Sequence, residues 1–96
     1  MEQRIVTKMV LRHLDDMAGI GRTFDEICEH VSSRVRRPAE GQVNRGLTYL
    51  ENAGYAEDCR ATAADERLWR VTAAGQRMAN RMVPANELDP MIYGGG

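Results

Sequence analysis

Polar side chains that can hydrogen-bond to nucleotide bases gather on one side of a helix predicted over residues 38–53. With successive residues about 100° apart around a helix, that side and its flank carry Gln42, Asn44, Arg45, Thr48 and Asn52. Arginine can form two hydrogen bonds to guanine, asparagine and glutamine can do so to adenine, and threonine can meet a polar edge or the thymine methyl group. This side therefore predicts contacts in the major groove of DNA. The alternative is that Arg45 and Thr48 are ordinary polar surface.

Two glycines lie within the same predicted helix. Gly41 and Gly46 each destabilise a helix by roughly 1 kcal/mol relative to alanine, and glycine is useful where another group must come close to the backbone. We therefore expect a close approach to DNA at Gly41 and to another helix at Gly46.

A cluster of arginines precedes the helix. Arg34, Arg36 and Arg37 come just before Pro38, in a stretch that is poor in acidic residues. One interpretation is a solvated turn, and the other is a clamp that holds phosphate at the entrance to the helix.

The elements that must position these residues follow from the pattern of apolar residues. We predict helices over residues 2–18, from Thr23 to the arginine cluster, over 38–53, and over 72–82. Thr23 and Glu26 form a capping-box pattern, and Gly54 is placed to end the third helix in a left-handed conformation. The core is expected to include Val43, Leu47 and Leu50 from the third helix.

Two strand-like runs after Gly54, joined by a short polar stretch, predict a hairpin with Trp69 in the core. Ile20, between two glycines, is placed for a short edge strand. The first helix should carry a broad apolar side, with Arg4, Lys8, Arg12 and Asp15 on the polar side. His13 falls within the apolar side and is expected to be a packed histidine.

The composition indicates one small globular domain. The chain has 96 residues, of which 43% are hydrophobic and 28% are charged, and we assign residues 1–82 to the domain and 83–96 to a flexible C-terminal tail. No run approaches the roughly 18 apolar residues of a membrane span, and the N-terminus lacks the apolar segment of a signal peptide. We expect a cytoplasmic protein without a membrane partner.

Catalysis is not expected from this chain. The sequence contains no HExxH, GxSxG, P-loop or dinucleotide-binding glycine pattern. Cys28 and Cys59 form no CxxC pair, and Cys28 and His30 fall on different faces of a helix. We predict no enzyme, no cofactor and no metal.

The pattern V-x-R-x-L-x-x-L-E-x-x-G-Y over residues 43–55, with W-R-V-T-x-x-G over 69–75, resembles small bacterial and phage winged-helix regulators of the broad ArsR, MarR and PadR type. The resemblance implies an α+β fold, a winged helix-turn-helix with a three-helix core, a two- or three-stranded wing hairpin and a short C-terminal helix. It also implies that the third helix enters the major groove of double-stranded DNA and that the wing touches the flanking backbone. The full predicted DNA-binding set is Arg34, Arg36, Arg37, Gln42, Asn44, Arg45, Thr48, Asn52, Arg60 and Arg67.

The chain departs from that family in three respects. Asp65 and Glu66 fall at the expected tip of the wing, where phosphates would repel them. The chain has no closely spaced cysteine pair for metal sensing and no long C-terminal dimerisation helix. A homodimer would have to use the first helix or the tail.

A competing hypothesis is a winged-helix protein–protein interaction module, such as an accessory factor of a phage or mobile element, that does not bind DNA. The net charge of −1, the acidic wing and the apolar residues 91–93 in the tail favour it. Fold alone does not decide between the two functions.

Overall fold

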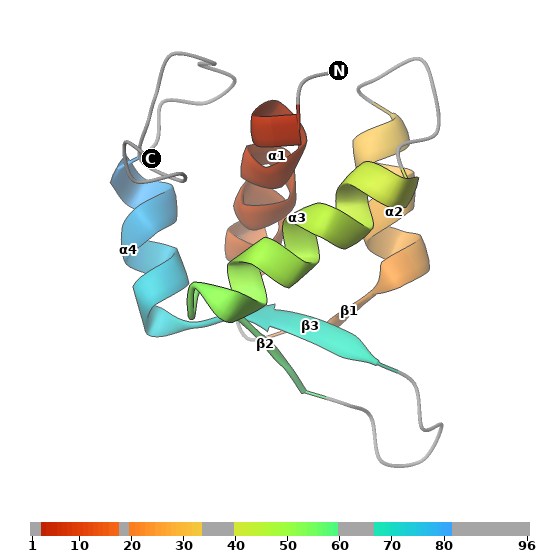
Figure 1. Ribbon diagram of the computed structural model, residues 1–96. Coiled ribbons are helices and arrows are strands. Elements are labelled where there is room, and N and C mark those ends of the chain that lie inside the picture. The colour runs from red at the N-terminus through yellow and green to blue at the C-terminus, as the bar shows by residue number, and fades with distance from the viewer. Residues whose placement is uncertain (1–2, 18–19, 34–39, 60–66, 82–96) are drawn as a thin grey trace.

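The computed structural model describes residues 3–17, 20–33, 40–59 and 67–81 of the protein (Figure 1). Within these residues the elements are α1 (Gln3–Asp16), β1 (Arg22–Thr23), α2 (Phe24–Ser32), α3 (Glu40–Asn52), β2 (Ala56–Asp58), β3 (Leu68–Val71) and α4 (Ala73–Arg81). The chain is thus a small α+β unit, as predicted. The predicted tail, residues 83–96, lies outside the described residues.

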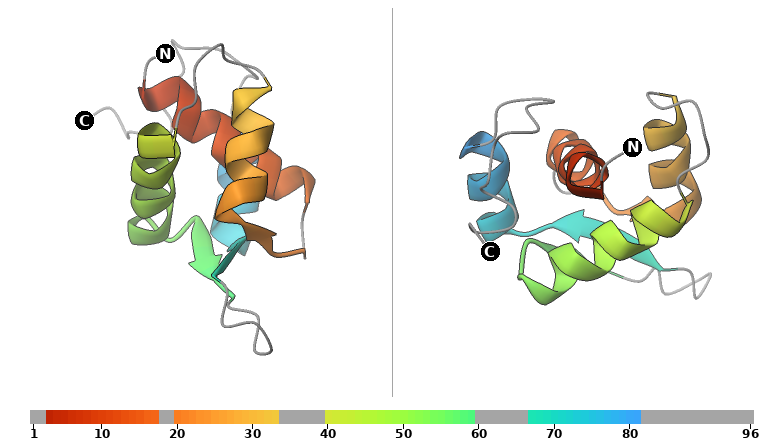
Figure 2. Two further views of the ribbon diagram at one scale, coloured as in Figure 1. Left: turned by 90° about the vertical axis from the view of Figure 1, so that its right-hand side faces the viewer. Right: turned by 45° about the horizontal axis from the view of Figure 1, so that its top comes forward.

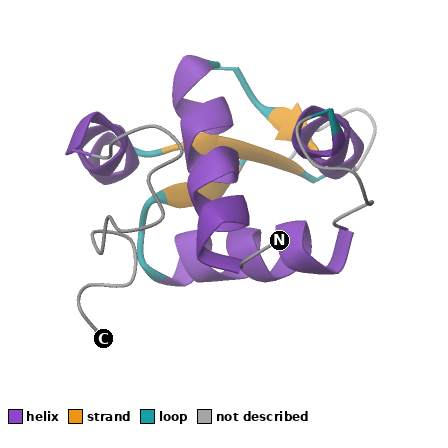
Figure 3. Ribbon diagram, turned by 90° about the horizontal axis from the view of Figure 1, so that it is seen from above, coloured by secondary structure: helices purple, strands orange, loops and turns teal. Residues whose placement is uncertain are grey.

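The helices surround α1, and the sheet closes one end of the bundle. Figures 1 and 3 show α1 between α2 and α4, with α3 crossing in front of them. Val6, Val10, Leu11 and Leu14 of α1 are fully buried, and α1 packs against all three other helices and against β3. The core is therefore built around α1.

This central position overturns one prediction. Lys8 was expected on a solvated side of the first helix, but it is only 4% exposed, and its neighbour Thr7 is fully buried. A helix that is packed against partners on several sides has little surface left for a polar face. The prediction that His13 is packed is confirmed, because it is buried and its ring stacks on that of His30 with centroids 3.9 Å apart.

The strands form an antiparallel sheet in the order β1-β3-β2. Trp69 in β3 lies opposite Asp58 in β2 and Arg22 in β1. The predicted hairpin is confirmed, but the predicted strand at Ile20 is wrong. The Ile20 N–H donates to the carbonyl of Met17 at 2.8 Å, which keeps Ile20 in the turn that follows α1, and the strand begins at Arg22.

The predicted capping box fixes the start of α2. The Thr23 hydroxyl accepts a hydrogen bond from the Glu26 backbone N–H at 3.1 Å, and the Glu26 carboxylate accepts one from the Thr23 N–H at 2.9 Å. These two bonds satisfy backbone donors that the first turn would otherwise leave unpaired. The hydrogen bond from the Thr23 backbone is the main reason why the pKa of Glu26 lies below its ordinary value.

The end of α3 and the start of α4 are joined through Thr72. Gly54 has a φ of 83° and ends α3, with the Tyr55 N–H donating to the Leu50 carbonyl at 2.8 Å. The Thr72 hydroxyl donates to the Gly54 carbonyl at 2.6 Å and accepts from the Gly75 N–H at 3.0 Å. This junction fixes the base of the hairpin between the two helices.

Candidate nucleic-acid interface

One side of α3 is anchored in the core. Val43, Leu47 and Leu50 are at most 1% exposed, as predicted. Gly46 faces α1, where a Cβ added to it would lie 3.1 Å from Thr7 Oγ1. The predicted close helix contact at Gly46 is confirmed, and α3 cannot rotate about its axis without disturbing it.

The opposite side of α3 carries the predicted polar side chains at the surface. Asn44, Arg45, Thr48 and Asn52 are all exposed, and Gln42 is half-buried at the flank. The Thr48 hydroxyl donates to the Asn44 carbonyl one turn earlier, at 2.9 Å. A threonine held in this way still presents a methyl group and acceptor lone pairs to a ligand. Five of the predicted site residues thus come from one helix, and four of them share its exposed face.

Acidic residues on α3 are confined to the margins of this face. Glu40 is exposed at the first turn of the helix, and Glu51 is half-buried near the other end. No lysine or further acid lies between them. The exposed face therefore presents neutral hydrogen-bonding groups and one positive charge.

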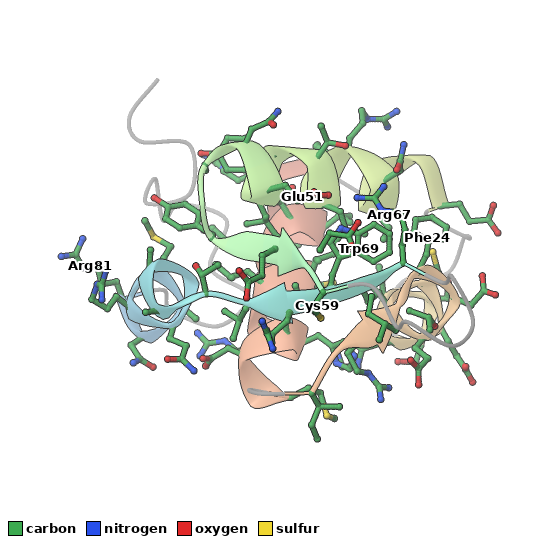
Figure 4. The ribbon with its side chains drawn as sticks, turned by 90° about the horizontal axis from the view of Figure 1, so that it is seen from below. Phe24, Glu51, Cys59, Arg67, Trp69 and Arg81 are labelled. Carbon is green, nitrogen blue, oxygen red and sulfur yellow. The ribbon has the colours of Figure 1, made fainter. Side chains whose placement is uncertain are left out.

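Glu51 is bound by the hairpin. Its Oε1 accepts a hydrogen bond from Trp69 Nε1 at 2.8 Å and lies 3.1 Å from Arg67 Nη2. Arg67 Nε also pairs with Asp58 at 2.9 Å, and the guanidinium carbon lies 4.5 Å from the centre of the Trp69 ring. Figure 4 shows Glu51, Arg67 and Trp69 meeting where α3 faces the sheet. We call Glu51, Asp58, Arg67 and Trp69 the Arg67 brace.

The brace changes the interpretation of the wing. Arg67 was expected to touch DNA, but its Nε and Nη2 donors already bind the carboxylates of Asp58 and Glu51. In the same hairpin, Arg70 Nη2 lies 2.6 Å from Glu57 Oε1. The spacing of these residues along the sequence did not reveal the pairs, because each forms only when the hairpin closes or packs on α3. The two arginines are thus matched by three carboxylates, so these side chains carry no excess of positive charge.

Several predicted site residues lie outside the described residues. These are the arginine cluster that precedes α3 and the wing arginine, namely Arg34, Arg36, Arg37 and Arg60. The acidic wing tip, Asp65 and Glu66, is outside as well.

The described surface offers little apolar area for a partner. Ile20, at 58% exposure, is its one exposed large apolar side chain. The first helix, predicted as a possible dimer interface, has Asp16 as its one exposed residue within Gln3–Asp16. Within the described residues, α1 is therefore buried or half-buried against its own domain at every position but one.

A reactive thiol or a metal site would be a second kind of functional site. Burial, with smaller effects of Glu40 and Asp25, raises the pKa of the Cys28 thiol to about 11, so this thiol stays protonated and a poor nucleophile at neutral pH. The part of the chain that the structure describes holds no group of three His, Cys, Asp or Glu side chains placed to bind a metal ion. It also holds no helix long and apolar enough to cross a bilayer.

Comparison of the chain with protein-family models, with curated proteins and with solved structures finds no match.

Proposed function

We propose that this chain is a winged-helix protein that binds double-stranded DNA and regulates transcription. In this proposal α2 and α3 form the helix-turn-helix, β2 and β3 form the wing, and α3 lies in the major groove. The order of the elements and the antiparallel sheet beside α3 are compatible with this fold. Regulation would follow from occupancy of an operator.

The exposed face of α3 is the observation that carries the proposal. It combines an arginine with two asparagines and a threonine, Arg45, Asn44, Asn52 and Thr48, on a helix whose other side is fully buried. These are side chains that distinguish base pairs in the major groove. A rigidly anchored helix holds such groups in fixed relative positions.

The same face suits a protein partner less well. The cores of protein interfaces are enriched in aromatic residues, methionine and arginine, and of these the exposed face of α3 has only Arg45. The described residues contain a single exposed large apolar side chain, Ile20, which lies in the turn after α1.

The hairpin has a supporting role in this proposal. The Arg67 brace ties it to α3, and the paired charges give it little attraction for phosphate. Backbone contacts are therefore assigned to the arginine cluster before α3, Arg34, Arg36 and Arg37.

Selection of duplexes from a random pool, followed by anisotropy titration at several salt concentrations, tests the proposal. Arg45→Ala should weaken binding to the selected duplex by about 1–3 kcal/mol, with a much smaller effect on random duplex. Arg81→Ala is the matched control, because it also removes one exposed arginine but lies on α4 and points away from α3 (Figure 4). Equal losses in both variants would contradict a specific role for α3.

The interaction module remains the second candidate, since the described hairpin pairs its own charges. Passage of the wild-type protein over heparin and over random duplex at low salt separates the two. A DNA-binding protein should be retained and should elute steeply with salt. Flow-through on both columns, with no duplex enriched from the pool, would favour the module.

A further inference from the structure

The side chain of Gln3 joins the start of α1 to the exposed face of α3. Its Nε2 donates to the Gln42 carbonyl at 2.8 Å and to Thr7 Oγ1 at 3.2 Å. Its Oε1 accepts a hydrogen bond from Arg45 Nε at 3.1 Å. The amide is therefore fixed on its nitrogen side and presents its oxygen to Arg45. Figure 2 shows the N-terminal part of α1 beside α3.

Arg45 is held at one edge of its guanidinium and left open at the other. Gln3 is its one hydrogen-bonding partner within the described residues, and the bond uses Nε. The side chain folds back over Gly41, where an added Cβ would lie 3.5 Å from Nη1 and 4.0 Å from Nη2. Because position 41 has no side chain, nothing there extends past the two terminal nitrogens.

We infer that Gln3 is a positioning residue that orients Arg45 so that Nη1 and Nη2 bind a guanine end-on. The inference rests on the proposed function. With Nε occupied, the donors left for a base are the two terminal nitrogens, and a pair of parallel donors matches the O6 and N7 acceptors of guanine. An adenine at the same place offers N7 beside an amino donor, which would repel the second nitrogen.

Orientation by Gln3 also lowers the entropy lost on binding. A free arginine side chain must be immobilised when it contacts a base, and an arginine already held in place loses less freedom. Removal of the Gln3 amide should therefore reduce the preference for guanine by about two- to tenfold. The electrostatic attraction between Arg45 and the duplex should remain.

Gln3→Met tests the inference, because methionine has a similar length but cannot bond Arg45, Gln42 or Thr7. The selected duplex is compared with copies in which each guanine in turn is replaced by adenine or by 7-deazaguanine, which lacks the N7 acceptor. Replacement of one particular guanine should weaken binding by the wild type, and this loss should depend on Arg45. In Gln3→Met the same replacement should weaken binding less. In an Arg45→Ala background, Gln3→Met should cause no further loss of preference.

Thr23→Ala is the stability control. It removes the cap of α2 and leaves the contacts of Gln3 and Arg45 in place, so it should keep the guanine preference even if its melting temperature falls as much as that of Gln3→Met. Loss of preference in both variants in proportion to melting temperature would overturn a positioning role. So would an unchanged guanine preference in Gln3→Met.

The wild-type result separates this inference from the proposed function. If the wild type enriches no duplex, both fail. If it enriches a duplex in which no guanine depends on Arg45, the DNA-binding proposal stands and the role of Gln3 is wrong.

Discussion

The exposed face of α3 and the hairpin beside it both carry arginines, but folding gives these arginines different neighbours. Arg45 has a neutral amide, that of Gln3, as its partner within the described residues. Arg67 has two carboxylates and the ring of Trp69, and Arg70 has Glu57. In this chain an arginine is therefore most available to an outside ligand where folding brings no acid to it. The count of basic residues is a poor guide to the binding surface.

The strongest test of this comparison uses Gly41 on the exposed face of α3 and Gly75, a residue of α4 that packs against the base of the hairpin. A Cβ added to Gly75 would overlap the Tyr55 carbonyl oxygen and lie 2.7 Å from Val71 Cγ2, whereas one added to Gly41 would meet only the end of Arg45. Gly75→Ala should lower the free energy of unfolding by about 3 kcal/mol, the upper range for overpacking. Gly41→Ala should leave it unchanged or raise it by up to about 1 kcal/mol through helix propensity.

Urea unfolding followed by circular dichroism measures both variants. Equal stability of Gly75→Ala and the wild type would mean that the backbone at the base of the hairpin moves to accept the added methyl group.

The next test removes one arginine from each region, Arg67 from the hairpin and Arg45 from α3. Arg67→Ala should lower the free energy of unfolding by about 1 kcal/mol, because it removes a cation–π contact and two partly exposed ion pairs. Arg45→Ala should change stability by less than about 0.5 kcal/mol, as is usual for a surface position. Duplex affinity should show the reverse order. Thermal melting and anisotropy on the same samples measure stability and duplex affinity. A single variant that loses more of both would contradict the prediction.

The start of α2 provides a stability change that alters no side chain of α3 or of the hairpin, although the backbone of Thr23 pairs with Leu68 in β3. Thr23→Ala removes the capping hydroxyl and should lower stability by about 1 kcal/mol, with duplex affinity unchanged well below the melting temperature. A fall in affinity that follows stability in this variant would show that binding reports folding rather than contacts.

The same cap predicts an acid limb in the stability curve. The pKa of Glu26 is lower in the folded chain than its ordinary value of 4.5. Its contribution is therefore complete above that value and is lost as the pH falls from about 4.5 through the folded pKa. Melting temperatures between pH 6 and pH 3 should fall less steeply in Glu26→Gln than in the wild type. Parallel curves would assign the acid limb to other groups.

The smallest effect is expected at the outer edge of the hairpin. Arg70 and Glu57 are both about half exposed, and such pairs add little to stability because water and salt screen them. Arg70→Ala should leave the melting temperature unchanged. Arg70→Ala and Arg81→Ala each remove one positive charge from outside α3, so they should lower affinity for random duplex to the same small extent. A clearly larger loss in Arg70→Ala would return the wing to the contact surface.

Local patterns predicted much of the fold. The capping box of Thr23 and Glu26, the stop at Gly54 and the buried line through Val43 each depend on residues a few positions apart. The helices α1, α3 and α4 begin and end within two residues of the predicted positions, whereas α2 ends at Ser32, before the predicted arginine cluster. Each of these features is defined by the spacing of neighbouring residues, so it can be predicted without knowledge of the tertiary structure.

Contacts between distant residues could not be predicted in the same way. Gln3 and Arg45 are 42 positions apart, and Arg67 and Glu51 are 16 apart. Lys8 looked like a surface residue because the helical pattern does not reveal how many neighbours surround a helix. The exposed face of α3 was predicted from its own residues, but the residues that orient or neutralise its charges come from other elements.

The position of Trp69 gives the molecule a built-in optical reporter. It is the sole tryptophan of the chain, it is 5% exposed, and its indole N–H is bound to α3 through Glu51. Separation of the hairpin from α3 would hydrate the ring and move its emission to longer wavelengths, whereas a ligand received by α3 without such separation would leave the wavelength in place. The fluorescence of unlabelled protein is therefore sufficient to follow the contact between the hairpin and α3 during titration with a duplex.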